Sequence, residues 1–180
     1  MKENYQKYKI YFKKFKKLID EFDISLIKKI EKELKKFKNS NKKVFIFGNG
    51  GSASISSHVS TDLVKICKIK AVTLNEANFI TCFANDYGYE NWIKQALIAH
   101  SEKNDLVILI SSSGESKNMI NAAKYCKGRL KLITFTGFKK NNTLSKIGRI
   151  NLWINSKKYN FVENIHQLIL LSIVDNLKND

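Results

Sequence analysis

The chain is short of the residues on which several classes of protein depend. Its 180 residues include no proline, eight glycines and three cysteines. Cys67, Cys82 and Cys126 are odd in number, widely spaced and set among apolar residues. This pattern argues against a disulfide framework or a cysteine zinc site and predicts buried, reduced thiols. The apolar runs, such as residues 168–171, are too short to cross a bilayer, so no membrane partner is expected.

Acidic residues are also scarce, because 16 Asp and Glu stand against 32 Lys and Arg and give a net charge of +16. A basic surface can bind nucleic acid through its phosphates. The basic residues are spread along the whole chain, however, so we predict a solvated surface and no nucleic-acid partner. The positive potential would still attract a phosphorylated, anionic substrate.

No repeat or low-complexity linker divides the chain, and 43% hydrophobic residues are enough for one domain with a full core. The amino end is polar and lacks the apolar region of a signal peptide, which predicts a cytoplasmic protein.

The first 40 residues are lysine-rich and lack glycine. Apolar residues recur there at steps of three and four from Tyr8 to Leu18, and again from Leu26 to Phe37 after Asp23, a predicted helix cap. We expect residues 1–40 to form a helical segment that packs against an apolar surface, either the chain's own sheet or a second subunit.

From residue 41 to residue 180, strand and helix patterns alternate. Short apolar strands separated by helices predict an α/β fold in three layers, with a five-stranded parallel sheet between two helical layers. The predicted strands are 43–47, 69–74, 106–110, 130–135 and 150–154. The predicted helices are 53–66, 77–84, 88–99, 115–126 and 161–177.

Two glycine- and serine-rich loops each follow a strand and precede a helix. They are Gly48–Ser52 and Ser111–Ser116. Free backbone N–H groups and the helix dipole make each such loop an anion site, and the serine hydroxyls add donors without adding charge. Neither loop has the spacing of a dinucleotide-binding or P-loop motif, so no nucleotide cofactor is expected. Together the loops predict a site for a phosphorylated small molecule at the carboxyl ends of the strands.

These loops, with His58 and residues 85–88 between them, resemble the sugar isomerase (SIS) domain family, whose sheet is flavodoxin-like. Within that family the pattern is most similar to the phosphoheptose isomerases. The resemblance covers nearly the whole chain and implies an aldose–ketose isomerase that acts on sedoheptulose 7-phosphate or a related sugar phosphate through a cis-enediol. It also implies a homotetramer packed through its helices and a role in lipopolysaccharide or capsule synthesis.

Carried over by position, the resemblance implies a substrate site with phosphate-binding serines and sugar-binding groups. These residues are Asn49, Gly50, Gly51, Ser52, Asn85, Asp86, Ser111, Ser112, Ser113, Ser116 and Glu163. It implies that Asp62 stands where the family has its glutamate base, four residues after His58. Some members of the family bind zinc with this histidine and carboxylate. The corresponding set here would be His58, Asp62 and Glu163.

The chain departs from the family pattern on its last helix. The family has Gln, then His three residues later, then a second His five further on, whereas this chain has Glu163, His166 and Leu171. Leucine can neither bind a metal nor transfer a proton. Glu163 is therefore the predicted acid or additional ligand, and His166 is predicted to pack in the core. Glu90 and Glu115 are local alternatives, although glutamates in a first helical turn are usually partners of the dipole.

Two functions of different classes remain open. The first is a sugar-phosphate isomerase with Asp62 and Glu163 as catalytic residues. The second is an SIS protein that binds a sugar phosphate without catalysis and acts as a sensor or protein-binding regulator. Both interpretations retain the phosphate loops, whereas His58 with a carboxylate four residues later favours the enzyme.

Overall fold

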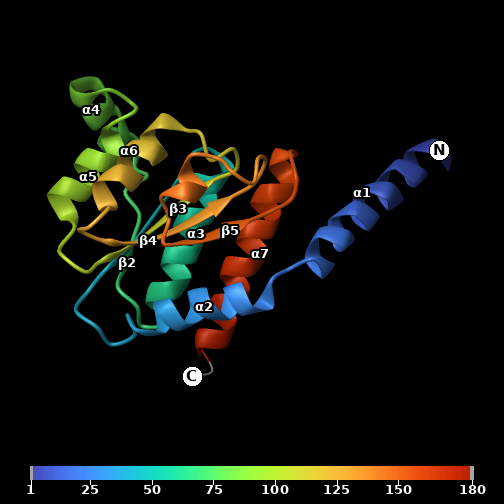
Figure 1. Ribbon diagram of the computed structural model, residues 1–180, viewed down its shortest axis with the longest axis horizontal. Helices are drawn as coiled ribbons and strands as arrows, with labels where there is room; N and C mark the ends of the chain where they lie inside the picture. The colour runs from blue at the N-terminus through green and yellow to red at the C-terminus, as the bar shows by residue number, and fades with distance from the viewer. Residues whose placement is uncertain (1, 179–180) are drawn as a thin grey trace.

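The computed structural model describes residues 2–178, with side chains from Tyr5 onward (Figure 1). The helices in chain order are α1 (Lys2–Asp20), α2 (Ile24–Lys35), α3 (Gly51–Lys65), α4 (Ala77–Tyr87), α5 (Trp92–His100), α6 (Lys117–Cys126) and α7 (Tyr159–Lys178). The strands are β1 (Val44–Gly48), β2 (Ala71–Val72), β3 (Leu106–Ser111), β4 (Lys131–Thr136) and β5 (Ile150–Trp153), and a 3-10 turn, η1 (Leu144–Lys146), precedes β5.

The five strands form one parallel sheet in the order β2-β1-β3-β4-β5, which confirms the predicted fold class. β1 and β3 are neighbours in register, with Val44 opposite Leu106 and Gly48 opposite Ile110. The two glycine- and serine-rich loops therefore leave adjacent strands at the same edge of the sheet. The order reverses between these two strands, which is where ligands bind in open parallel sheets.

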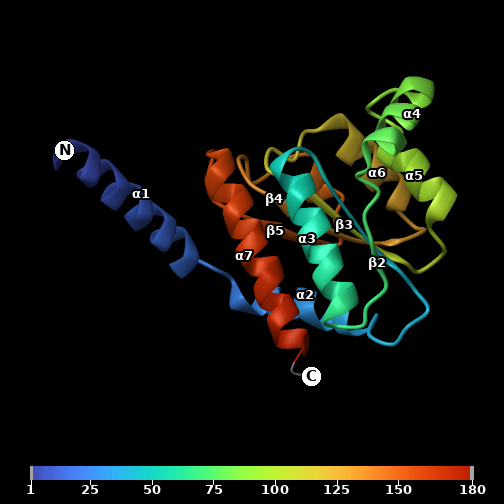
Figure 2. The same ribbon diagram turned by 180° about the vertical axis from the view of Figure 1, so that it is seen from behind.

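Alternate side chains of the central strands β1 and β3 enter two separate hydrophobic clusters, as the two-residue period of a strand requires. Val44 and Ile46 pack with residues of α2, α3 and α7, whereas Phe45 and Phe47 pack with residues of α5 and α6. Figure 2 shows α3 and α7 side by side on one face of the sheet. Both faces are thus covered, which explains why the strands read as continuous apolar runs.

The two amino-terminal helices differ in how they meet this core. α2 begins where Asp23 accepts a hydrogen bond from the backbone N–H of Leu26, as predicted for a cap. Ile30 and Leu34 of α2 are buried in the cluster that also contains α3 and α7. α1 instead projects away from the body of the molecule (Figures 1 and 2). Its contact is made near Phe161, whose ring centroid lies 4.6 Å from that of Tyr11.

Several predicted boundaries were wrong by a few residues. β2 pairs with β1 through Ala71 and Val72 rather than over 69–74, because Ile69 makes an isolated antiparallel bridge with Lys38 instead. α4 continues to Tyr87 and ends at Gly88, whose φ of 81° is in the left-handed region. α5 therefore starts at Trp92 and not at residue 88.

The prediction that all three cysteines are buried was wrong for one of them. Cys67 and Cys126 are buried, and burial raises the pKa of Cys126 to about 12. Cys82 is exposed on α4, because that helix buries none of its residues fully. Among residues 2–178, no helix has the length and apolar character that a bilayer crossing requires.

Candidate active site

The two predicted anion loops come together in one small cleft. It has a volume of about 80 Å³, enough for several water molecules, since one needs roughly 10–15 Å³. Its walls come from both loops, the end of β3 and the start of α7. They are formed by Asn49, Ser52, Ile110, Ser111, Ser112, Ser113, Ser116, Tyr159 and Glu163.

Glycines give both loops their shape. Gly50 has a φ of 54° and Gly114 a φ of 67°, conformations that other residues rarely adopt. A Cβ at Gly48 would collide with the backbone of Ser52, so β1 can turn tightly into α3 because this position has no side chain. The turn brings the amino terminus of α3 to the cleft, where its free N–H groups favour an anion.

The serines provide the hydroxyl donors of the cleft. Ser52, Ser111 and Ser112 are at most 5% exposed. The Ser111 hydroxyl lies 3.5 Å from that of Ser116, whereas the buried Ser112 hydroxyl has no hydrogen-bond partner within residues 2–178. Buried polar atoms are normally paired, and the Ser112 hydroxyl is free to donate to a group bound in the cleft. An anion with several acceptor oxygens satisfies this donor set.

Asn49 is held at the cleft by two residues that the sequence reasoning missed. Its side-chain amide and that of the buried Asn118 exchange two hydrogen bonds, of 3.1 and 2.8 Å. The Tyr89 hydroxyl also donates to Asn49 Oδ1 at 3.1 Å. This network fixes which way the Asn49 amide points. Neither partner belongs to a loop motif, and only their position in the fold reveals them.

Glu163 brings a carboxyl group into the same cleft. It lies on the first turns of α7 and reaches the amino terminus of α3, where its Oε2 occupies the space that a Cβ on Gly51 would need. Partial burial raises the pKa of Glu163. A carboxyl group with a raised pKa beside hydroxyl donors can exchange a proton with a bound ligand.

A second polar cluster lies further along the same pair of helices. His58 Nε2 is 3.3 Å from Asp62 Oδ2 one turn later on α3, and the Gln167 amide of α7 lies 3.3 Å from His58 Nδ1. His58 and Asp62 thus lie on one face of α3, as their spacing of four residues indicates. Gln167 was not predicted, because it stands one helical turn after the position where the resemblance expects a glutamine.

The predicted metal set of His58, Asp62 and Glu163 is not assembled. Within residues 2–178, no three His, Cys, Asp or Glu side chains are placed to hold a metal ion. Glu163 turns toward Gly51, and the position next to His58 is filled by Gln167. Zinc sites in proteins have at least three protein ligands, so the residues present do not fit the group.

Other predicted site residues lie elsewhere. Asn85 and Asp86 are exposed on α4 and do not line the cleft. The side-chain amide of Asn85 donates a hydrogen bond to Asp86 Oδ1 at 3.0 Å. Leu171 is partly buried and packs against the core cluster of α3 and α7. Glu115 accepts hydrogen bonds from the hydroxyl and backbone N–H of Thr143, which lower its pKa. It anchors the second loop and is not free for chemistry.

His166 packs in the core, as predicted. It is fully buried, and in its neutral form Nε2 donates to the backbone carbonyl of Thr136 at 3.2 Å. Burial lowers the pKa of His166 to about 4, so it is uncharged at neutral pH.

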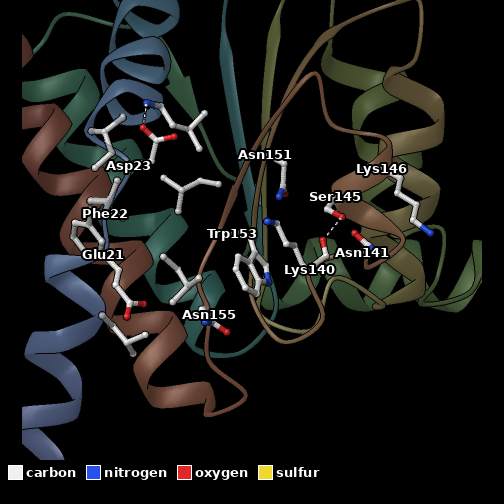
Figure 3. A pocket seen from close by; sticks show the side chains of 16 residues that line it. Glu21, Phe22, Asp23, Lys140, Asn141, Ser145, Lys146, Asn151, Trp153 and Asn155 are labelled. Carbon is white, nitrogen blue, oxygen red and sulfur yellow. Dashed lines mark hydrogen bonds between the residues drawn. The ribbon is translucent and has the colours of Figure 1, made fainter.

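A larger cavity than the serine cleft lies away from both clusters. It has a volume of about 600 Å³ and opens beside β5 and the turn between α1 and α2 (Figure 3). Glu21 and Asp23 stand on one wall, and Lys140 and Lys146 on the other, with Trp153 between them. Apolar side chains such as Leu26 and Ile169 also line the cavity. Although this cavity is large, its polar side chains do not converge on one point as the serine hydroxyls of the smaller cleft do. We therefore place ligand binding in the smaller cleft.

Comparison with known proteins identifies the class. The family model described as SIS domain matches residues 10–137. A phosphoheptose isomerase from Fusobacterium nucleatum is 31% identical over 95% of this chain and 91% of its own. One from Thermodesulfovibrio yellowstonii is 39% identical over 69% of this chain, a segment that spans 66% of the relative. The structure of a phosphoheptose isomerase from Neisseria gonorrhoeae superposes with a TM-score of 0.88 at 20% identity, covering 99% of each chain.

The chain therefore belongs to the SIS domain family and, within it, to the group of the phosphoheptose isomerases.

Proposed function

We propose that the protein is an aldose–ketose isomerase of sedoheptulose 7-phosphate or a closely related sugar phosphate, in the synthesis of lipopolysaccharide or capsule. The observation that carries this proposal is the buried, unpartnered Ser112 hydroxyl in a cleft of serines at two helix amino termini. Its relatives from Fusobacterium nucleatum and Thermodesulfovibrio yellowstonii bear the name of this activity.

The arrangement along α3 suits a substrate with a phosphate at one end and a carbonyl group at the other. Ser52 lies at the cleft and Asp62 ten residues later, so about 15 Å of helix separates them. A side chain on a helix leans toward the amino terminus, which shortens the gap for Asp62. An extended long-chain sugar phosphate covers more of this distance than a short one.

In the proposed reaction, the serines and loop amides hold the phosphate while Asp62 moves a proton between C1 and C2. Glu163 exchanges a proton with the sugar oxygen that lies nearest the cleft, since its raised pKa keeps the acid form available closer to neutral pH. Asn49 orients a sugar hydroxyl from its fixed amide. Asn85 and Asp86 remain predicted substrate residues that would have to approach from α4. No step is assigned to zinc.

The test is to incubate the protein with sedoheptulose 7-phosphate and to follow formation of the heptose 7-phosphate by chromatography. One arm contains added zinc and another a chelator. Turnover in the chelator arm supports the carboxylate mechanism. Binding of sugar phosphates without turnover in either arm would contradict an isomerase and support the sensor or regulator.

We also propose a homo-oligomer, a tetramer by the family resemblance, that assembles through the segment 1–40 and above all through α1. Tyr5, Tyr8 and Phe12 of α1 are each at least 64% exposed on a helix that projects from the body (Figure 1). An apolar face of this size is typical of an interface. Phe12→Glu should shift the mass measured by light scattering toward the monomer, with Lys13→Glu as the control. A monomeric wild-type protein at micromolar concentration would contradict the proposal.

A further inference from the structure

The amide of Gln167 joins α7 to the His58–Asp62 pair on α3. The contacts are 3.3 Å from Gln167 Nε2 to His58 Nδ1 and 3.3 Å from His58 Nε2 to Asp62 Oδ2. Both ring nitrogens of His58 are therefore engaged. With a protein group facing each ring nitrogen, we expect His58 to act through its neighbours.

The groups that face the two ring nitrogens of His58 favour one tautomer. An ionised carboxylate has no hydrogen of its own, so the hydrogen of the neutral ring is favoured on Nε2, which faces Asp62 Oδ2 at 3.3 Å. In the neutral ring Nδ1 then accepts, and the Gln167 NH₂ group donates to it. Asp62 Oδ1 is left as the oxygen that can take a proton.

We propose that Gln167 is a positioning residue of the isomerase, which fixes the tautomer of His58 so that His58 holds Asp62 with Oδ1 free. This inference rests on the proposed function, because it assigns Asp62 as the base. Gln167 itself touches no substrate and acts through His58.

The contact from Gln167 is important because His58 and Asp62 are partly exposed. The side chains of His58 and Asp62 are 49% and 24% exposed. An exposed pair four residues apart on a helix contributes little and samples several rotamers. A contact from a separate, packed helix restricts the pair to one arrangement. α3 and α7 are held together by buried residues such as Val59 and Ile169, so Gln167 is presented from a fixed position.

The experiment combines steady-state kinetics on sedoheptulose 7-phosphate with ¹⁵N NMR of the labelled histidine rings. Gln167→Leu keeps the volume and removes the donor. Gln167→Lys keeps a donor on a flexible side chain. Asn176→Leu removes an exposed amide from the far end of the same helix and serves as the control.

We expect Gln167→Leu to lower kcat by about 10- to 100-fold with KM within about twofold, the effect of a base displaced by an ångström or less. The NMR signals of His58 should change from the Nε2–H form to a mixture of tautomers. Gln167→Lys should restore the Nε2–H form and part of kcat, and Asn176→Leu should change neither.

An unchanged tautomer in folded Gln167→Leu would overturn the proposal, as would an unchanged kcat. If Gln167→Leu does not fold, the same criteria apply to Gln167→Thr, which is too short to reach the ring. The NMR measurement needs no turnover. A changed tautomer in a protein without isomerase activity would therefore refute the proposed function while showing that Gln167 controls His58, and the positioning of a catalytic base would fall with the function.

Discussion

The serine cleft and the His58–Asp62–Gln167 cluster both include residues of α3 and α7, but they are built in opposite ways. In the cleft, Ser52, Ser111 and Ser112 are at most 5% exposed and are placed by backbone turns. In the cluster, the His58 side chain is 49% exposed and is placed by side-chain contacts. A single chain thus forms a sheltered serine cleft for binding. The His58–Asp62–Gln167 cluster, which is proposed for the chemistry, is exposed to water. Isomerisation needs shelter from solvent, so the open cluster is the part that requires a cover.

The largest effect that separates the two regions should come from the base. Asp62→Asn removes the proton acceptor and keeps the shape, so we expect turnover to fall by about 10²–10⁴-fold. Phosphate affinity, measured by calorimetry, should not change. Asp175→Asn, at an exposed position further along the chain, is the control. Equal losses of turnover and phosphate affinity would mean that the two regions are one.

Both regions contain residues of α7, so comparing them requires this helix to stay folded. The buried His166 on α7 limits the pH range over which the fold is stable. The pKa of His166 is lowered from 6.5 to about 4, so the unfolded chain binds more protons between these values. The free energy of unfolding should therefore fall by about 3 kcal/mol as the pH drops from 6.5 to 4. His166→Gln should flatten this dependence in urea titrations, whereas the exposed His100→Gln should not. An equally steep fall in His166→Gln would assign the acid sensitivity to other groups.

The cleft should respond to loss of its hydroxyls. Ser112→Ala together with Ser116→Ala removes two donors to an anion, and we expect inorganic phosphate to bind about 10- to 100-fold more weakly. The melting temperature should stay within a few degrees. Calorimetry checks the affinity, and Ser172→Ala on the outer side of α7 is the control. Unchanged affinity would place the anion site elsewhere.

The smallest effect should come from the acid within the cleft. Burial raises the pKa of Glu163, so its carboxyl group becomes charged at a higher pH than usual and then repels a bound anion. Sulfate affinity should fall as the pH rises through this range and should be several-fold higher in Glu163→Gln above it. The same variant should be more stable than wild type above the ordinary glutamate range, because unfolding releases the wild-type proton there. Sulfate affinity in wild type that is independent of pH between 5 and 8 would contradict the assignment.

The fold was largely predictable because the periodicities are strong. The helices show a clear period, and strands such as residues 106–110 are short apolar runs bounded by turn residues, which is typical of a strand buried on both faces. Boundaries failed where a glycine or an isolated bridge decided the outcome, as at Gly88 and Ile69. The cleft was predictable because each loop carries its own anion-binding chemistry in sequence.

The second cluster was only half predictable. His58 and Asp62 lie on one helix, so their spacing of four residues shows that they meet. Gln167 and Asn118 reach their partners from other elements, and no local pattern records such a contact. The prediction of a metal site at His58, Asp62 and Glu163 was wrong for a related reason. The direction of the Glu163 side chain depends on the space left by the missing side chain of Gly51.

That empty space links two positions that lie far apart in the sequence. A methyl group on Gly51 would overlap the Glu163 carboxyl, yet the clash falls on the mobile end of a side chain and not on the backbone. An alanine at position 51 would therefore be tolerated by the fold and would displace the acid from the cleft. Among relatives with this carboxyl group, selection should act on the pair, with glycine at one position wherever the acid is kept at the other.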